Sequence, residues 1–269
     1  MMNPRLARIL VCLQLVLVLL PLSVVAIWAF SASWPWPELL PQTFSIKGFT
    51  EIFRPSNDLP GVLGVSIFIA LASAALATLV AALAARAVVH FDFVGKEVFK
   101  FATLLPFIIP SVVFAMGIQI AFIRMGLART VLGVVIAHAI VSLPYAYAIM
   151  SDVTAAMGAK LEDAARTLGA NKRQMLLQVT LPSLLPGLIS SMSMSYILSF
   201  SQYFLTLLIG GGTVRTFMVS MFPFLTSGDR TVANAYGLVF LVVTFCVFLL
   251  FELLLKRFGY SSKQSFFNL

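Results

Sequence analysis

The longest polar stretch of this chain reads Leu161-Glu-Asp-Ala-Ala-Arg-Thr-Leu-Gly-Ala-Asn-Lys-Arg-Gln-Met-Leu-Leu-Gln-Val-Thr-Leu-Pro182, and it lies between two strongly apolar runs. Good helix formers fill residues 161–168. Gly169 follows at the position where helices commonly end in the left-handed conformation. Asn171 can then cap a second short helix over residues 172–180. The stretch therefore predicts a helix, a bend and a second helix at a membrane surface.

The chain as a whole is far more apolar than a soluble domain. Of its 269 residues, 60% are hydrophobic and 10% are charged, against about 25% charged residues in soluble domains. Several apolar runs of about 20 residues can cross a hydrocarbon core of about 30 Å as helices. They are not the short alternating segments of a transmembrane β-barrel. An all-α polytopic membrane protein is therefore predicted, in which Cys12 and Cys246 are small hydrophobic residues of the apolar runs.

Six apolar runs predict six transmembrane helices, over residues 9–30, 61–89, 101–123, 131–150, 184–209 and 235–255. The first run is longer than the core of about 7–15 residues in a signal peptide, which favours a retained span over a cleaved leader. The alanine-rich second run is expected near the centre of the bundle, because small residues let helices approach closely in lipid. Pro106 and Pro110 predict a broken third span, and Pro182 predicts an interruption before the fifth.

Basic residues set the expected orientation. With both termini inside, twelve Lys and Arg residues fall on the inner side and six on the outer side. Because positive charge gathers on the cytoplasmic side, both termini and the loop 151–183 are expected in the cytoplasm. The same rule explains the net charge of +8 without a nucleic-acid partner. The expected division is residues 1–60, a first helix and external loop; 61–257, a core membrane domain with the loop 151–183; and 258–269, a cytoplasmic tail.

Ala164 and Ala165 are adjacent small residues on an otherwise charged helix. They would let that helix sit deep in a groove of another protein, with Glu162 and Asp163 pairing with basic groups at the rim. The alternative is an amphipathic helix that lies on the lipid surface. The acidic pair disfavours it because the cytoplasmic leaflet is itself negative. A protein docking site is therefore the favoured interpretation.

The fifth predicted span carries a stripe of polar residues, which are Ser191, Ser195, Ser199, Gln202 and Thr206. On one continuous helix they would fall within about 80° of arc, and polar groups avoid lipid, so this face is expected to look inward. Alternatively, these side chains bond carbonyls of their own or a neighbouring helix. Tyr203 lies beside the stripe. His138 in the fourth span is a further candidate, with a packing role as its alternative. No workable catalytic arrangement is found among these residues.

The spacing of the polar stretch resembles a known motif. The order Asp163-Ala164-Ala165, three residues, Gly169, nine residues, Val179, one residue and Leu181-Pro182 resembles the EAA loop of membrane subunits of binding-protein-dependent ABC importers. That pattern is Glu-Ala-Ala, three residues, Gly, nine residues, Ile, one residue and Leu-Pro. Asp163 stands where Glu is usual, and Val179 replaces Ile. The resemblance spans about residues 60–257 and is greatest to the spermidine/putrescine, thiamine and related permease group.

The resemblance implies a MetI-like importer permease fold and an inner-membrane subunit that forms half of a substrate pathway. The residues it assigns to ATPase coupling are Glu162, Asp163, Ala164, Ala165, Gly169, Leu181 and Pro182. The candidates for the substrate pathway are Ser195, Ser199, Gln202, Tyr203, Thr206 and His138. The expected partners are a second permease in a heterodimer, two cytoplasmic ATPase subunits, an external solute-binding protein and the lipid bilayer. The substrate stays open among polyamines, thiamine, phosphonates and iron chelates.

ATP hydrolysis is expected in a partner, because the chain has no G-x-x-x-x-G-K-[ST] phosphate loop. The chain is accordingly expected to be no enzyme and to hold no cofactor or metal. The spans also lack the clear intramembrane carboxylate usual in a proton- or sodium-driven carrier, which favours an ATP-driven complex. The alternative function is a signalling or scaffold membrane protein whose loop docks a cytoplasmic regulator without transport.

Overall fold

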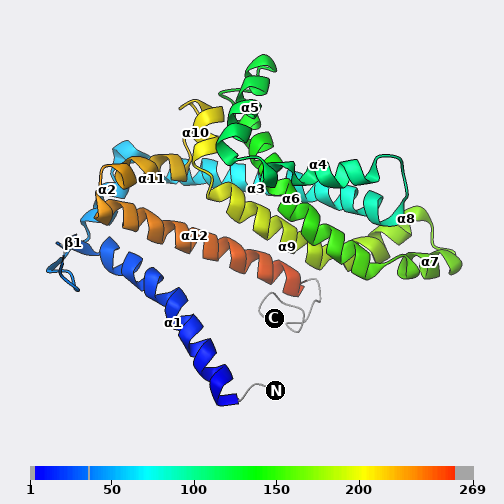
Figure 1. The fold of residues 1–269 in the computed structure, drawn as a ribbon, viewed down its shortest axis with the longest axis horizontal. Coiled ribbons are helices and arrows are strands. Elements are labelled where there is room, and N and C mark those ends of the chain that lie inside the picture. The colour runs from blue at the N-terminus through cyan, green and yellow to red at the C-terminus, as the bar shows by residue number, and fades with distance from the viewer. Residues whose placement is uncertain (1–3, 36, 258–269) are drawn as a thin grey trace. The chain divides into compact units, whose positions relative to one another are not determined.

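The structure is a computed structural model that describes residues 4–35 and 37–257, so the predicted tail 258–269 lies outside the described residues. The described chain is almost entirely helical (Figure 1). The first elements are α1 (Pro4–Ala29), β1 (Ser31–Ser33), β2 (Thr43–Phe44), α2 (Lys47–Ile52), the 3₁₀ turn η1 (Pro55–Asn57), α3 (Leu59–His90), α4 (Lys96–Ile108), α5 (Ser111–Arg124) and α6 (Val131–Met157). They are followed by α7 (Lys160–Thr167), α8 (Lys172–Gln174), the π-helix η2 (Met175–Thr180), α9 (Leu181–Phe200), α10 (Phe204–Gly210), α11 (Phe217–Thr226) and α12 (Arg230–Arg257).

Six membrane spans are consistent with these helices. Five helices are long and apolar enough to cross a bilayer, and the bent pair α4–α5 makes a sixth span if its two helices cross together. The two members of that pair are bent by 110° at residues 109–110. Pro110 is the N-cap residue of α5, and proline cannot continue the preceding helix because it lacks an N–H. The predicted break in the third apolar run is confirmed at Pro110, whereas Pro106 lies inside α4.

The chain forms two compact units, unit 1 (Met1–Gly61 and Ser220–Phe245) and unit 2 (Val62–Val219 and Cys246–Leu269). In unit 1, β1 and β2 pair antiparallel, with Ser31 opposite Phe44. The Thr231 hydroxyl donates to the Ser31 carbonyl at 2.8 Å, and the Arg230 guanidinium lies over the Trp28 ring. The predicted loop 31–60 is therefore folded into short elements of its own.

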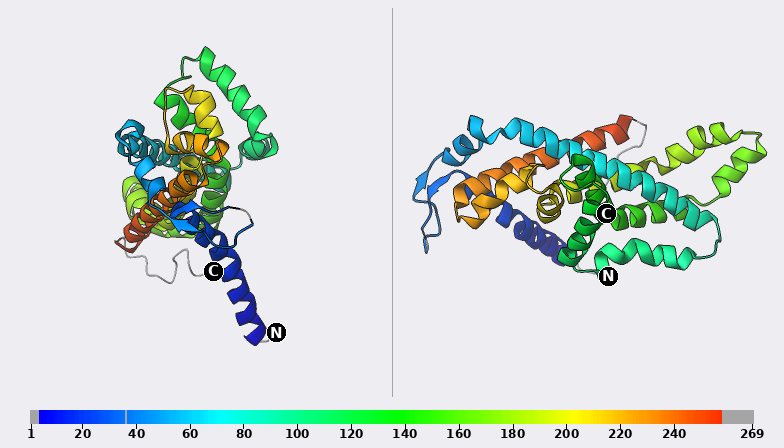
Figure 2. Two further views of the ribbon diagram at one scale, coloured as in Figure 1. Left: turned by 90° about the vertical axis from the view of Figure 1, so that its left-hand side faces the viewer. Right: turned by 90° about the horizontal axis from the view of Figure 1, so that it is seen from above.

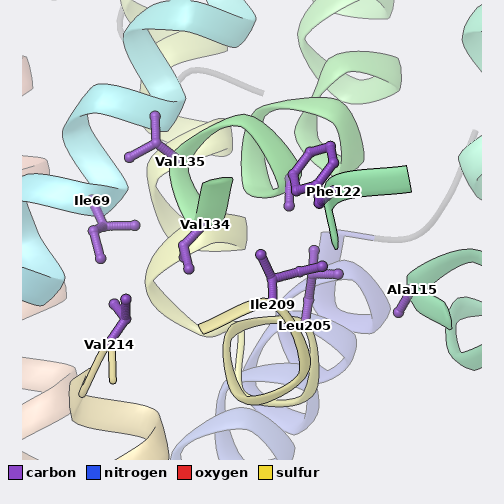
Figure 3. Packing of buried hydrophobic residues seen from close by; sticks show 9 residues of the cluster. Ile69, Ala115, Phe122, Val134, Val135, Leu205, Ile209 and Val214 are labelled. Atoms are coloured by element: carbon purple, nitrogen blue, oxygen red, sulfur yellow. The ribbon is translucent and has the colours of Figure 1, made fainter. Parts of the chain in front are cut away.

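Unit 2 holds an apolar core built by α3, α5, α6 and α10. Figure 3 shows Val134, Leu205 and Ile209 facing one another within one buried cluster. A second cluster consists mostly of alanines of α3 and α6 packed with Met150 and Leu184. The buried alanines of α3 are Ala70, Ala74, Ala77, Ala81, Ala82 and Ala85. Their burial confirms the prediction that the second span is central, and it follows from the close approach that small residues allow.

Three expectations about helix boundaries are wrong. The predicted fifth span breaks at Ser201–Tyr203, between α9 and α10. Pro182 does not interrupt the chain, because residues 172–200 run as one helix. The π-helix η2 just before it ends with the Leu181 N–H bonded to the Leu176 carbonyl, and this wider turn accommodates the proline. The loop predicted over 210–234 contains the apolar helix α11 and the start of α12.

A methyl group at Gly187 is expected to destabilise unit 2. A Cβ on Gly187 of α9 would lie 2.9 Å from both γ-methyl groups of Val153 on α6, and the branched valine side chain has little freedom to move away. Overpacking of this kind costs about 1–3 kcal/mol. We expect Gly187→Ala to lower the Tm of the purified chain in detergent, measured by differential scanning fluorimetry.

Gly64→Ala is the matched control for this prediction. A Cβ on Gly64 of α3 has no atom within 4 Å, so its methyl group should leave the Tm unchanged or slightly higher. Equal Tm values for the two variants would show that α6 and α9 are not in tight contact at Gly187.

Candidate functional site

The bend between α7 and α8 forms as its residues predict. Gly169 adopts a φ of +82°, in the left-handed region that glycine tolerates. Asn171 caps α8, because its side-chain oxygen accepts from the Gln174 N–H at 2.9 Å. The Gln174 side chain in turn accepts from the Asn171 N–H at 3.0 Å, which completes a capping box. The right-hand view in Figure 2 shows α7 and α8 meeting at this bend.

Glu162 points inward from α7 and is 8% exposed. Its Oε1 atom accepts a hydrogen bond from the Arg86 guanidinium of α3 at 2.9 Å and another from the Thr180 hydroxyl at 2.6 Å. Burial raises the pKa of this carboxyl, but the hydrogen bonds from Arg86 and Thr180 outweigh burial and leave the pKa below its ordinary value. Glu162 is therefore ionised at neutral pH. It does not lie at the exposed rim where the sequence placed it.

Asp163 lies about 100° from Glu162 around α7, and its side chain is 65% exposed. Its one ion pair in the described chain is a loose contact of 3.6 Å with Arg166, which water screens. The two adjacent carboxylates thus differ in role. Glu162 holds α7 to its own chain, whereas Asp163 is open to a partner.

An apolar stripe runs along the exposed face of α7. Its members are Leu161, Ala164 and Leu168, and Leu168 is 88% exposed. The spacing of three and four residues places them on one helix face. Ala165 borders the stripe and is partly exposed. The sequence interpretation missed Leu161 and Leu168, although the same spacing was visible in the printed sequence.

Leu181 and Pro182 begin α9 and are exposed. They follow η2, so they lie at the same end of unit 2 as α7 and α8. The residues assigned to coupling therefore gather in one region, except that Glu162 is turned inward.

The polar stripe of the fifth span does not lie on one helix. Gln202 and Tyr203 occupy the break between α9 and α10 and are partly exposed. Ser195 and Ser199 lie on α9 and Thr206 lies on α10, and all three are buried in this chain. In this conformation the three buried side chains contact protein, whereas Gln202 and Tyr203 are partly exposed.

His138 joins the two sides of this break. It is 1% exposed on α6. Its Nδ1 atom lies 2.8 Å from the Ser199 hydroxyl, and its Nε2 atom lies 2.9 Å from the Thr206 hydroxyl. The Thr206 hydroxyl also bonds the Gln202 carbonyl at 2.9 Å. With both ring nitrogens bonded, His138 has the geometry of a packing residue, the alternative that the sequence left open.

Comparison with known proteins identifies one family. The family described as "Binding-protein-dependent transport system inner membrane component" matches residues 77–260. A permease named for 2-aminoethylphosphonate transport in Salmonella paratyphi A is 28% identical, with 92% of each chain covered. A spermidine/putrescine transport system permease of Haemophilus influenzae is 23% identical over 80% of this chain and 83% of its own length.

One solved structure has the same fold. It is a bacterial ABC transporter involved in the import of the acidic polysaccharide alginate, with a TM-score of 0.68 at 16% sequence identity. The match covers 92% of this chain and 94% of that one.

Removing the His138 side chain is expected to loosen the break between α9 and α10. His138→Leu deletes two buried hydrogen bonds and leaves the hydroxyls of Ser199 and Thr206 to bond their own helices. Hydrogen bonds between membrane helices contribute about 0.6–2 kcal/mol each, so we expect a lower Tm for the purified chain. Trypsin cleavage after Arg215 should also become faster if α10 is released.

Ser142→Ala serves as the control for this prediction. Ser142 lies one turn from His138 on α6, and its buried hydroxyl has no hydrogen-bond partner within the described chain. This variant should retain the wild-type Tm. A His138→Leu protein with the same Tm and cleavage rate as Ser142→Ala would contradict the bridging role.

Proposed function

This chain belongs to the family of binding-protein-dependent transport system inner membrane components, and from that premise we propose which of its surfaces perform each task. The family establishes the chain as the multi-pass membrane permease of an ABC importer, a non-catalytic subunit. ATP is handled by a partner ATPase, and solute is supplied by a binding protein.

We propose that α7 is the surface that seats in the ATPase. The observation that carries this proposal is the exposed apolar stripe of Leu161, Ala164 and Leu168 on a short, otherwise charged helix. Apolar side chains on a polar helix gain free energy when a groove covers them. Asp163 lies on the outer side of the same helix, where it can pair with a basic group at the groove's rim.

The orientation of the chain supports this assignment. The distribution of twelve basic residues against six favours a cytoplasmic position for the loop 151–183 and for both termini. Leu181 and Pro182, exposed beside the loop, would border the docked ATPase. We infer a heterodimer with a second permease. Because α7 presents one docking helix per permease, two ATPase subunits would serve the pair.

The substrate pathway is assigned to the break between α9 and α10. A break in a membrane helix exposes polar backbone only where it lines a cavity or is buried in protein. Gln202 and Tyr203 are the polar side chains at this break that stay partly exposed. The buried polar residues next to the break would hold the pathway residues in position. They are Ser195, Ser199, Thr206 and His138. The names of the relatives favour a small charged solute, either an aminophosphonate or a polyamine.

A carboxylate on the apolar stripe is expected to break ATPase docking. Ala164→Glu would bury an unpaired charge in the groove, which costs several kcal/mol, whereas the exposed α7 should fold normally. We expect at least a tenfold loss of ATPase co-purification and of ATP-dependent uptake. Uptake is measured with radiolabelled 2-aminoethylphosphonate, spermidine and putrescine in cells that express the complete transporter.

Ala155→Glu is the matched control. Ala155 is exposed near the end of α6, so the same substitution places its charge outside the docking helix. This variant should bind the ATPase within about twofold of wild type. Normal co-purification of Ala164→Glu, or a wild-type chain that binds a regulator and never an ATPase, would contradict the proposed docking surface.

A second variant tests the pathway separately. Gln202→Leu removes an amide at the break and should lower uptake about tenfold, the usual effect of losing a polar contact to a charged solute, with ATPase co-purification unchanged. Ser201→Ala is the control, because the exposed Ser201 hydroxyl bonds its own Leu198 carbonyl. Wild-type uptake by Gln202→Leu would remove this residue from the pathway.

A further inference from the structure

Three elements meet at a single carboxylate oxygen in unit 2. Glu162 Oε1 on α7 accepts from Arg86 on α3 at 2.9 Å and from Thr180 in η2 at 2.6 Å. Arg86 and Glu162 are 76 residues apart in the chain. Thr180 is 1% exposed and Glu162 is buried, whereas the Arg86 side chain is 27% exposed, so water competes less for these bonds than it does at a fully exposed ion pair.

The polarity of α7 shows why this contact matters. The apolar side chains of the helix face outward, and its inward residue is the charged Glu162. The attachment of α7 to the rest of unit 2 therefore depends on an ion pair and a hydrogen bond rather than on buried apolar contacts. Removing either member of the pair leaves the other charge partly buried and uncompensated.

The two hydrogen-bond partners of Glu162 belong to two different long helices. Arg86 lies one turn before the end of α3, and Thr180 directly precedes α9 in a helix that runs unbroken over residues 172–200. The far end of α9 carries Ser199, which His138 ties to α10 across the break. A continuous chain of contacts thus leads from α7 to the break at Ser201–Tyr203.

We propose that Arg86, Glu162 and Thr180 form a clamp that makes α7, α3 and α9 move as one body, so that displacement of α7 by the ATPase reaches the membrane helices. This inference rests on the proposed docking function of α7. The three residues are positioning residues: they contact neither ATP nor solute. Glu162 thereby acts on its own chain, whereas Asp163, Ala164 and Leu168 face the partner.

The test measures whether α3 and α7 keep their separation during the ATPase cycle. Spin labels are placed at Leu79 on α3 and Thr167 on α7, both exposed, in the full transporter with Cys12 and Cys246 replaced by alanine. Distance distributions are recorded by double electron–electron resonance without nucleotide and with ATP plus vanadate. The wild type should show one narrow distance that is the same in both states.

Glu162→Gln keeps the size of the side chain and removes its charge. We expect it to bind the ATPase within twofold of wild type and to lose the single narrow distance once ATP and vanadate are added. The charge exchange Arg86→Glu with Glu162→Arg should restore the narrow distance. Glu97→Gln is the matched control, since the ion pair of Glu97 with Lys100 on α4 is exposed.

Two results would overturn the clamp. One is a wild-type distance that changes when ATP and vanadate are added, because α3 and α7 would then separate in the cycle. The other is a Glu162→Gln protein with the wild-type distances in both states. Loss of ATPase binding by Glu162→Gln would assign Glu162 to docking and likewise contradict the clamp. A wild-type chain that binds no ATPase would instead contradict the proposed function. Co-purification of the wild-type chain alone gives this result, without any variant.

Discussion

A membrane interior offers no water to backbone groups, so a helix that breaks there must find other partners for its free carbonyls and N–H groups. The helix α10 shows how this chain meets that constraint. The Leu208 carbonyl accepts from the Gln119 side chain at 3.1 Å, and the Ile209 carbonyl accepts from the Arg129 N–H at 2.8 Å. His138 holds the opposite end of α10, at the break over residues 201–203, through Ser199 and Thr206. Polar residues that resemble solute ligands in the sequence are therefore, in large part, the supports that make a broken helix possible.

In α7 the usual positions of polar and apolar side chains are reversed. In a helix that packs on its own core, apolar residues face inward and charges face water. In α7 the leucines face outward and Glu162 faces inward. This arrangement is stable because Arg86 and Thr180 satisfy the buried carboxylate. In the proposed function a partner ATPase covers the outward leucines, so that the docking surface and the internal attachment are two sides of one short helix.

Small residues decide how closely the long helices of unit 2 approach. Alanines form the buried face of α3, and Gly187 places the α9 backbone against Val153 of α6. Such packing relies on contact rather than on a hydrophobic force, since lipid is as apolar as the side chains. The helices are therefore tightly packed. Tight packing is required if a displacement of α7 is to be transmitted to the break between α9 and α10.

The sequence by itself determined what is local or periodic. The long apolar helices, the buried alanine face of α3, the proline break between α4 and α5, the glycine bend at 169 and the Asn171 cap all depend on neighbouring residues, and each formed as predicted. Only the tertiary structure decided that Glu162 pairs with Arg86, that His138 bridges α9 and α10, and that the fifth span breaks at residues 201–203. These features depend on which helices lie side by side. Pro182 makes the same point, because a π-helix in the preceding turn lets the chain continue where the residue type alone predicts a stop.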